Sequence, residues 1–460
     1  MVKTTESLED TIIAVSTPPG AGGLGVVRLS GPQALSLAMR IFRPRKEIAR
    51  IPARRVILGD LAGTDGVPFD EAFLVFFKAP RSYTREDLVE ISCHGSPAVL
   101  GEIVRLGVKA GARRAHPGEF TRRALLRGRI DILQAEAVQS LVGAESLEQA
   151  RISYGQLEGR LSSKLREFRE RMIELLADIE TRLEFPGEGL GITDAGIDKS
   201  LRSASAFVAD LASSYEAGRL LGEGLTLVIV GKPNVGKSTL FNALVGKDRA
   251  IVTPFPGTTR DYLHERIKIG SGLFNLVDMA GLGKSDHPVE KAGIRKGEDL
   301  ARGADGILFL FDSSKKESRL DLELIRRFGR SKSVIVFNKI DLPRKIDKAK
   351  ILAESGNRTG VEISALKGLN VSALKNRIER TFTPDLKKWK EIILHGRQKD
   401  VLEGMRDHLE AGLRLFQEGY GEEIYAEEIR NAVSMLGRLT GEIQTEEVLQ
   451  SIFSRFCVGK

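Results

Sequence analysis

The residues GKPNVGKS, at 231–238, combine small, positively charged and hydroxyl-bearing side chains at a fixed spacing. They match the pattern G-x-x-x-x-G-K-[ST] and directly follow the apolar run LTLVIV. Glycines let backbone N–H groups curl around phosphates, Lys237 supplies charge to the β and γ oxygens, and Ser238 offers a hydroxyl to Mg²⁺. A helix from about Thr239 would point its positive end at the same phosphates. This stretch therefore predicts a site for a nucleoside triphosphate.

Two further motifs fit the metal and the terminal phosphate. DMAG (278–281) follows the run FNLV, which would place Asp278 near Mg²⁺ and Gly281 near the γ-phosphate. GTTRD (257–261) lies between the phosphate loop and DMAG, where a switch loop would carry Thr259 to Mg²⁺. DMAG alone would be interpreted as a turn, so its value lies in the order of the set.

The next two motifs fit the guanine base. NKID (338–341) follows SVIVF, and Asn338 and Asp341 suit the guanine edge. A carboxylate accepts hydrogen bonds from guanine N1–H and N2–H, whereas adenine offers no such pair of donors. SAL (364–366) follows VEI and predicts a second contact with the base. The ordered set predicts a GTPase domain that resembles the translation-factor-related GTPases.

The position that usually orients the attacking water is changed. In Ras-like switches a glutamine follows the D-x-x-G glycine, but here the residue is Leu282, which cannot hydrogen-bond a water. Hydrolysis then needs another polar group and another source of positive charge. Asn234, two residues before Gly236, is either a ligand for a monovalent cation such as K⁺ or a residue that turns the loop.

The elements that position these residues alternate along the chain. Short apolar runs between Gly and Pro turns predict an α+β domain over 1–122, with TIIAVS, LGVVRLS, EAFLVFFKAP and DLVEISCHG as strands. Helical spacing predicts an all-α part over 123–220, and strand–helix alternation predicts an α/β domain with a mostly parallel sheet over 221–382. Residues 383–460 are again predicted helical, so the α/β domain interrupts a discontinuous helical domain.

The helical spacing is clearest before the first Pro-Gly break. Apolar residues recur there at the spacing of one helix face: Met172, Leu175, Leu176, Ile179 and Leu183.

Composition indicates in which cell compartment the protein works and what kind of partner it binds. The 460 residues carry a net charge of +8 with a pI of about 9.3, which favours a polyanionic partner. Two cysteines, Cys93 and Cys457, do not make a disulfide framework and indicate a reducing cytosol. The first residues have no long apolar core and carry acidic side chains, so we expect no signal peptide, and no run approaches the ~20 apolar residues of a membrane span.

Motifs along the whole chain resemble one family. The motifs are TPPGAGGLGVVRLSG, ISCHGSP, HPGEFTRRALLRGRIDILQAEAV, EFPGE, GKPNVGKSTLFNAL, VTPFPGTTRD, DMAGL and the terminal FCVGK. Together and in this order they resemble the MnmE/TrmE family of tRNA-modification GTPases. The resemblance implies a multidomain fold: an N-terminal tetrahydrofolate-binding domain, a discontinuous helical domain and an inserted P-loop GTPase domain.

The resemblance also implies a function and partners. Such a protein hydrolyses GTP and works with the FAD-binding partner MnmG (GidA), as a homodimer within a heterotetramer or larger complex in the cytoplasm. It modifies carbon 5 of the wobble uridine of certain tRNAs to an aminomethyl or carboxymethylaminomethyl derivative. The one-carbon unit comes from a tetrahydrofolate derivative, 5,10-methylene or 5-formyl. The GTPase domains would dimerise in a K⁺-dependent way.

The family's nucleotide and metal residues fall on matching positions. The implied K⁺ ligands are Asn234, Thr253, Phe255 and Thr258, and the implied Mg²⁺ ligands are Ser238 and Thr259. Glu290 matches the water-positioning glutamate; taken alone it would be interpreted as a solvated helix residue. The full implied GTP site is Asn234, Val235, Gly236, Lys237, Ser238, Thr239, Thr253, Pro254, Phe255, Pro256, Gly257, Thr258, Thr259, Asp278, Met279, Ala280, Gly281, Asn338, Lys339, Asp341, Ser364 and Ala365.

The implied folate site joins the two ends of the chain: Arg28, Glu90, Arg129 and the terminal Lys460. The FCVGK tail would bring Cys457 near the carbon that is transferred. Cys457 is then either a nucleophile, which requires the thiolate, or a small apolar filler. Cys93 is expected in the core.

Four positions depart from the family pattern: Ala21, Met279, Gly283 and Arg129. The family usually has arginine at the first and lysine at the last of these positions, and DTAGLR where this chain has DMAGLG. The missing arginine at position 21 would weaken a contact with folate or with a partner.

A basic cluster between 105 and 129 has two interpretations. Its members are Arg105, Lys109, Arg113, Arg114, Arg122, Arg123, Arg127 and Arg129. They would contact tRNA phosphates, or form a solvated face with a partner for a folate carboxylate, and we expect a mixed role.

Two other functions remain open at this point. A ribosome-assembly GTPase would be a switch without modification chemistry, but the usual KH-type tail is not found. A relative of folate-dependent methyltransferases, gated by the GTPase domain, is the other alternative.

Overall fold

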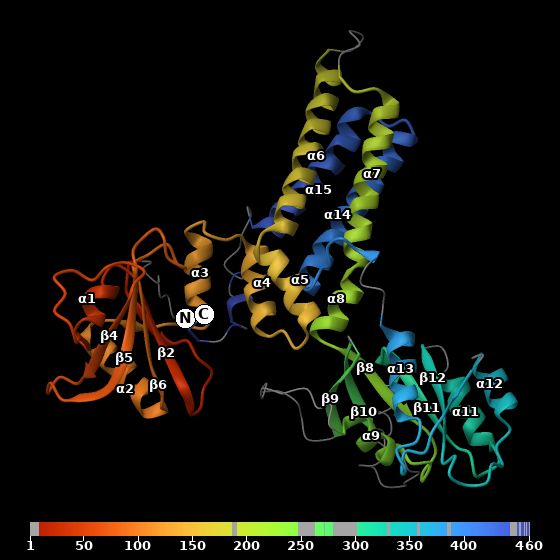
Figure 1. The fold of residues 1–460 in the computed structure, drawn as a ribbon. Helices are drawn as coiled ribbons and strands as arrows, with labels where there is room; N and C mark the ends of the chain where they lie inside the picture. The colour runs from red at the N-terminus through yellow and green to blue at the C-terminus, as the bar shows by residue number, and fades with distance from the viewer. Residues whose placement is uncertain are drawn as a thin grey trace, which may run out of the picture. The chain divides into compact units, whose positions relative to one another are not determined.

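The computed structural model describes residues 9–185, 191–246, 263–270, 272–278, 301–328, 332–356, 359–383, 388–441, 449, 452–454, 456 and 458–459 (Figure 1). Contacts divide the chain into two compact units. The N-terminal unit contains residues 1–139, 155–170 and 436–460, and the central unit contains residues 140–154 and 171–435. The predicted domain boundaries near 122, 220 and 382 stay predictions.

The N-terminal unit is built on a seven-stranded sheet in the order β3-β4-β5-β6-β2-β1-β7. Its strands are β1 (Ile12–Val15), β2 (Gly22–Ser30), β3 (Phe42–Pro44), β4 (Val56–Ala62), β5 (Pro68–Phe77), β6 (Leu88–Gly95) and β7 (Arg113–Arg114). All four runs predicted as strands here are strands. Alternation along the strands buries one face against α1 (Ala34–Ala38) and α2 (Pro97–Ala110). Cys93 lies in this core, as expected.

The opposite face of this sheet carries polar side chains in register. β2 and β6 are antiparallel, and Arg28 stands directly opposite Glu90. Ala14 of β1 stands opposite Arg28 on its other side. The sheet thereby places a predicted pair of ligand-binding residues side by side. Helix α3 (Glu119–Leu126) belongs to the same unit.

The remaining part is helical. Its helices are α4 (Ile132–Val142), α5 (Leu147–Leu157), α6 (Arg160–Glu184), α7 (Asp194–Ser213), α8 (Tyr215–Gly222), α14 (Gly396–Gln417) and α15 (Glu422–Thr440). Of these, α6, α7, α14 and α15 are the long amphipathic helices. In α6 the predicted stripe buries Met172, Leu175 and Ile179. Helices α7 and α14, almost two hundred residues apart, lie side by side (Figure 1). The helical segments before and after the α/β part therefore pack together, as predicted.

The α/β part is a six-stranded sheet in the order β13-β12-β11-β8-β10-β9, parallel except for β9. Its elements are β8 (Leu225–Val230), α9 (Lys237–Val245), β9 (Leu263–Ile269), β10 (Gly272–Asp278), β11 (Gly306–Asp312), α11 (Arg319–Phe328), β12 (Ser333–Asn338), α12 (Lys348–Ser355), β13 (Val361–Glu362) and α13 (Val371–Phe382). Apolar clusters cover both faces of the sheet, which confirms the predicted buried parallel strands.

The chain enters and leaves this part at neighbouring places. Gly224 lies against Leu273, and Thr383 lies against Gly272. In the described residues, no helix has both the length and the apolar character that crossing a bilayer requires.

Candidate functional site

The phosphate loop joins β8 to α9. Gly236 precedes the helix with a φ of 100°, and Asn234 adopts a φ of 64°. Left-handed backbone at these two residues wraps the loop around the start of α9, whose first N–H groups have no partners within the helix. The positive end of a helix and a ring of backbone N–H groups are suited to phosphate. The turn at Asn234 fits its loop-forming role, and its suggested role as a cation ligand stays a prediction.

Lys237 lies across this loop. Its Nζ donates to the carbonyl oxygens of Gly231 and Lys232, both at 3.0 Å. Burial lowers the pKa of Lys237, while the charge of Asp278 acts in the opposite direction. The ammonium group is thus held at the loop by two carbonyls, which phosphate oxygens can replace as partners.

Ser238 and Asp278 form a pair suited to a hard cation. Ser238 Oγ donates to Asp278 Oδ2 at 2.8 Å, and Asp278 is only 3% exposed. Its other oxygen, Oδ1, is buried and has no hydrogen-bond partner in the described residues. Mg²⁺ takes oxygen ligands and keeps several waters. A hydroxyl beside a carboxylate with an unsatisfied oxygen fits that demand.

Asn338 connects the phosphate loop with the base-binding loop. Its Nδ2 donates to the carbonyl of Val235 at 2.9 Å, and its Oδ1 accepts from the N–H of Ala365 at 2.9 Å. The side chain is 3% exposed. Asn338 therefore fixes the distance between two of the predicted motifs.

The neighbouring Lys339 and Asp341 face different partners. Lys339 has a φ of 63°, and its Nζ contacts the carbonyl of Asn234 at 2.8 Å and Asp312 Oδ2 at 2.7 Å. Asp341 is exposed, and a hydrogen bond from Ser364 lowers its pKa. An ionised, exposed carboxylate at this place can accept the paired N–H groups of guanine.

A second lysine of the loop was not singled out by sequence. Lys232 Nζ lies 2.6 Å from Asp321 Oδ2 and 2.9 Å from Ser318 Oγ. Asp321 also accepts from the N–H of Ser318 at 2.8 Å and so caps α11. The spacing S-x-x-D before an apolar helix was the signal that would have found the cap, but not its lysine partner.

Part of the predicted nucleotide site lies outside the described residues. This holds for Thr253, Pro254, Phe255, Pro256, Gly257, Thr258, Thr259, Met279, Ala280, Gly281 and Glu290. Of the predicted K⁺ ligands only Asn234 is described. Among the described residues no cluster of His, Cys, Asp and Glu is arranged for a metal.

In the N-terminal unit, two predicted residues, Arg28 and Arg129, lie against one tyrosine, and a third, Glu90, pairs with Arg28. Arg28 Nε and Nη2 donate to Glu90 Oε1 at 2.9 and 2.6 Å. The guanidinium of Arg28 lies 5.8 Å from the ring centre of Tyr83, and so does that of Arg129. The Phe120 ring is 5.6 Å from the Arg28 guanidinium. Sequence patterns gave no indication of Tyr83 or Phe120, because neither belongs to a charge or glycine motif.

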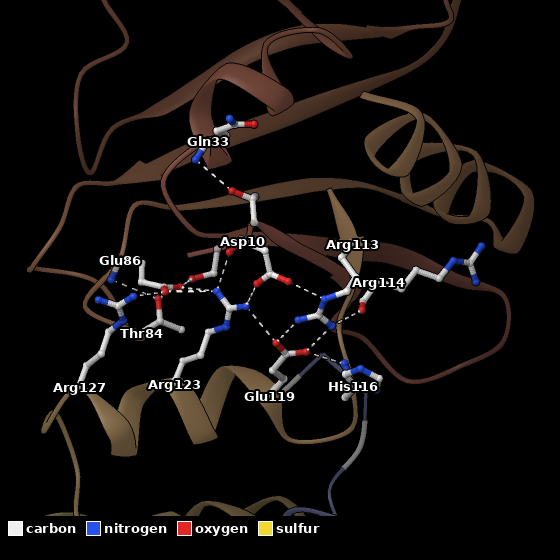
Figure 2. Close-up of polar contacts among 12 residues, drawn as sticks. Asp10, Gln33, Thr84, Glu86, Arg113, Arg114, His116, Glu119, Arg123 and Arg127 are labelled. Atoms are coloured by element: carbon white, nitrogen blue, oxygen red, sulfur yellow. Dashed lines mark hydrogen bonds and ion pairs between the residues drawn. The ribbon is translucent and has the colours of Figure 1, made fainter. Parts of the chain in front are cut away.

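The same unit contains a buried cluster of charges around Arg123 (Figure 2). Arg123 is 2% exposed and contacts Glu86 Oε1 at 3.2 Å and Glu119 Oε1 at 3.0 Å, as well as Asp10. Arg113 contacts Asp10 and Glu119, each at 2.6 Å. Although burial raises the pKa of both Asp10 and Glu119, hydrogen bonds and charge from the arginines lower it more.

The Arg123 cluster corrects one interpretation of the basic run. Arg123 belongs to a buried ion network and Arg113 is about two-thirds buried beside it, so the run is not one solvated face. Arg127 contacts Glu86 at 2.7 Å from the edge of the same network. Arg105 is exposed and pairs with Glu102. Charge counted along the sequence could not distinguish these environments.

The carboxyl-terminal tail packs near the same sheet. Val458 forms an antiparallel bridge with Pro117, and Ser16 Oγ donates to the carbonyl of Gly459 at 3.0 Å. Phe456 is buried against Gly118. Cys457 and Lys460 themselves lie outside the described residues. The described neighbours place the tail backbone at the end of β1.

Known proteins are similar to this chain over almost its whole length. The profile described as MnmE helical domain matches residues 132–457, and the profile of the GTP-binding protein TrmE N-terminus matches residues 11–129. Proteins named tRNA modification GTPase MnmE are similar over 98% of this chain. The one from Thermoanaerobacter pseudethanolicus is 38% identical over 99% of its own length, and that from Thermotoga maritima is 39% identical over 100%. The one from Aquifex aeolicus is 37% identical over 100%.

Solved structures align only in part. The G domain of FeoB from T. maritima is 27% identical and covers 34% of this chain and 98% of its own, with a TM-score of 0.27. This score is too low to compare the folds.

Proposed function

The chain belongs to the MnmE family of tRNA modification GTPases, and from this premise we propose how its residues bind GTP and serve tRNA modification. The enzyme hydrolyses GTP, and its family acts on tRNA. In the proposal, loop 231–238 binds the phosphates, while Asn338, Asp341, Ser364 and Ala365 form the guanine site. Family membership decides against the ribosome-assembly alternative.

The observation that carries the nucleotide proposal is the Asn338 side chain. It bonds the phosphate loop at Val235 and the base loop at Ala365, so the two loops are held at one spacing. Lys237 would transfer its hydrogen bonds from Gly231 and Lys232 to the phosphates. Because Asn338 already holds the two loops at one spacing, binding would change the partners of Lys237 but not the distance between the loops.

Two cations complete the proposal. Ser238, Asp278 and Thr259 would hold Mg²⁺, directly or through water, and the ion would neutralise the phosphate oxygens. Asn234 would hold K⁺ together with Thr253, Phe255 and Thr258, and this ion would supply the charge that an arginine supplies in other GTPases. Glu290 would position the water that Leu282 cannot.

The modification chemistry is proposed for the N-terminal unit. Arg28, Glu90, Arg129 and Lys460 would hold a tetrahydrofolate derivative, which supplies the one-carbon unit, and Cys457 would lie near that carbon. The contacts of Arg28 with Glu90, and of Arg28 and Arg129 with Tyr83, support this grouping. We further propose a cytoplasmic homodimer that works with an FAD-binding MnmG partner on carbon 5 of the wobble uridine.

The test is GTP hydrolysis by the purified full chain in KCl and in NaCl. We expect a rate that is at least about tenfold higher in KCl, because a bound cation would stabilise charge in the transition state. Asn234→Ala should lose this dependence. Asn242→Ala, an exposed asparagine on the helix that follows the loop, should keep it.

Equal rates in the two salts would refute the K⁺ proposal and leave Asn234 as a turn residue. The positive charge would then have to come from a partner protein.

A further inference from the structure

Tyr83 is fixed at both ends of its side chain. The ring packs against a small buried cluster, Ile12, Ala14, Ala115 and Phe120. Its hydroxyl forms a hydrogen bond of 2.9 Å with Thr121 Oγ1. Tyr83 therefore has little freedom to move its ring.

The same ring lies close to two positive charges. The guanidinium groups of Arg28 and Arg129 are each 5.8 Å from its centre, within the range of cation–π attraction. Arg28 also pairs with Glu90. In the part of the chain that the structure describes, the Arg129 side chain pairs with no carboxylate, and its contact is with Tyr83. Its N–H donors are thus available to an anionic ligand.

Hydrogen bonds of buried side chains also fix the loop that carries Tyr83. Thr84 and Ser30 share a hydrogen bond of 2.6 Å, and Ser30 also donates to Glu86 at 2.7 Å. Glu86 is 5% exposed and contacts the buried Arg123 (Figure 2). The ring is consequently presented by a segment that is organised before any ligand arrives.

We propose that Tyr83 is a positioning residue of the N-terminal site: its ring gathers Arg28 and Arg129, so that both guanidinium groups face one anionic, ring-bearing ligand of the folate class. This inference rests on the proposed function, which assigns folate to Arg28, Glu90 and Arg129. Two like charges repel each other, and the negative face of an aromatic ring offsets that repulsion. An aliphatic residue of similar size would fill the core equally well but would not attract the arginines.

The experiment measures binding of 5-formyltetrahydrofolate to the full chain by calorimetry, for the natural protein and for Tyr83→Phe, Tyr83→Leu and Tyr83→Met. We expect Tyr83→Phe to stay within about threefold of the natural affinity, because the ring face remains. Tyr83→Leu and Tyr83→Met should bind about tenfold more weakly or worse, which corresponds to the loss of the cation–π contacts. Tyr420→Leu, at an exposed tyrosine of the central unit, should bind normally.

Circular dichroism of each variant tests folding, and the unbranched methionine gives a second aliphatic variant where leucine disturbs the core. If the natural protein binds and both aliphatic variants bind equally well, Tyr83 is only a core residue and the inference is wrong. If the natural protein does not bind, the folate assignment fails and the role of Tyr83 fails with it. A Tyr83→Phe variant as weak as Tyr83→Leu would assign the effect to the Thr121 hydrogen bond and also overturn the inference.

Discussion

The phosphate loop of the central unit and the arginine site of the N-terminal unit are organised in opposite ways. In the loop, the polar side chains come from one short stretch and contact the loop itself or the next motif, as Lys237 and Ser238 do. In the arginine site, the groups come from positions 28, 83, 90 and 129. Hydrogen bonds through Thr84, Ser30 and Glu86 connect this site with the buried network around Arg123. Ligand binding must exchange the hydrogen bonds of Lys237 in the first site, whereas in the second site Arg129 pairs with no carboxylate among the described residues.

The two sites differ in what stabilises their structure. A phosphate loop depends on backbone geometry, so its side chains can change partners without loss of the fold. A site made of side chains from distant segments needs a rigid support, and here that support is a set of buried charges. Substitutions in the Arg123 cluster should therefore destabilise the fold of the N-terminal unit. Substitutions in the phosphate loop should lower GTPase activity and leave the stability of the fold unchanged.

The largest expected effect is a loss of stability when the Arg123 cluster is disrupted. Arg123→Met removes the common partner of Asp10, Glu86 and Glu119. Three carboxylates are then left with only two arginines, Arg113 and Arg127, which should destabilise the N-terminal unit by about 3 kcal/mol. Thermal unfolding followed by circular dichroism reports on both units. Trp389, the only tryptophan, lies in the central unit, so its fluorescence follows that unit alone.

The matched control is Arg105→Met, at an exposed partner of Glu102, which should change the stability very little.

The stability that the Arg123 cluster contributes should depend on pH. Because the folded pKa values of Asp10 and Glu119 are lowered, this contribution is fully present above the ordinary carboxyl range, about pH 4. It should be lost as pH falls through the lowered values. An Arg123→Met protein with natural unfolding at pH 7 would contradict the supporting role.

The next effect is on the loop. Lys237→Ala removes the charge that meets the β and γ phosphates and should lower kcat/KM for GTP by about a hundredfold or more. Its unfolding should stay close to that of the natural protein, since Lys237 contacts only carbonyls that water can satisfy. Lys268→Ala, at an exposed position of β9, serves as the control in both assays. A strongly destabilised Lys237→Ala protein would erase the contrast between the two sites.

The smallest expected effect is on KM for GTP. It tests whether the contact of Lys232 with Asp321 helps to organise the phosphate loop. Lys232→Met breaks the contact with Asp321 and Ser318 and should raise KM for GTP several-fold, up to about tenfold, because the loop becomes less organised. Lys232→Arg should restore most of the affinity, as an arginine can still reach Asp321. Lys315→Met, at an exposed lysine nearby, should have no effect. Natural KM values for Lys232→Met would show that backbone geometry alone suffices.

The sequence indicates why the loop residues lie together more directly than it does for the arginine site, and the ligand-binding roles at both sites stay predictions. Lys237 and Ser238 come shortly after β8, while Asp278 and Asn338 end β10 and β12, so their meeting at one edge of a parallel sheet follows from topology. The Arg28–Glu90 pair was predicted only through a family resemblance, although its cause is a cross-strand register. That register depends on how β2 and β6 pair, which local patterns do not specify.

The Arg123 cluster shows a different limit. Its contacts join residues that are up to 113 positions apart, and burial reverses the usual interpretation of a basic run. A sequence records the charge of Arg123 but not its exposure. Tyr83 was missed for a related reason, since an aromatic residue in a loop is ordinary until two cations are found beside it.

The neighbouring entry and exit of the α/β part affect how the helices come together. Gly224 lies against Leu273 and Thr383 against Gly272, so the inserted segment, once folded, holds its two ends close. For α14 to reach α7, an unfolded insert of about 160 residues would have to close as a loop, whereas a folded one acts as a linker of about ten. Since closure entropy grows with the logarithm of loop length, early folding of the insert would lower that cost by about 2 kcal/mol. The inserted domain would then be the template on which the two halves of the helical domain find each other.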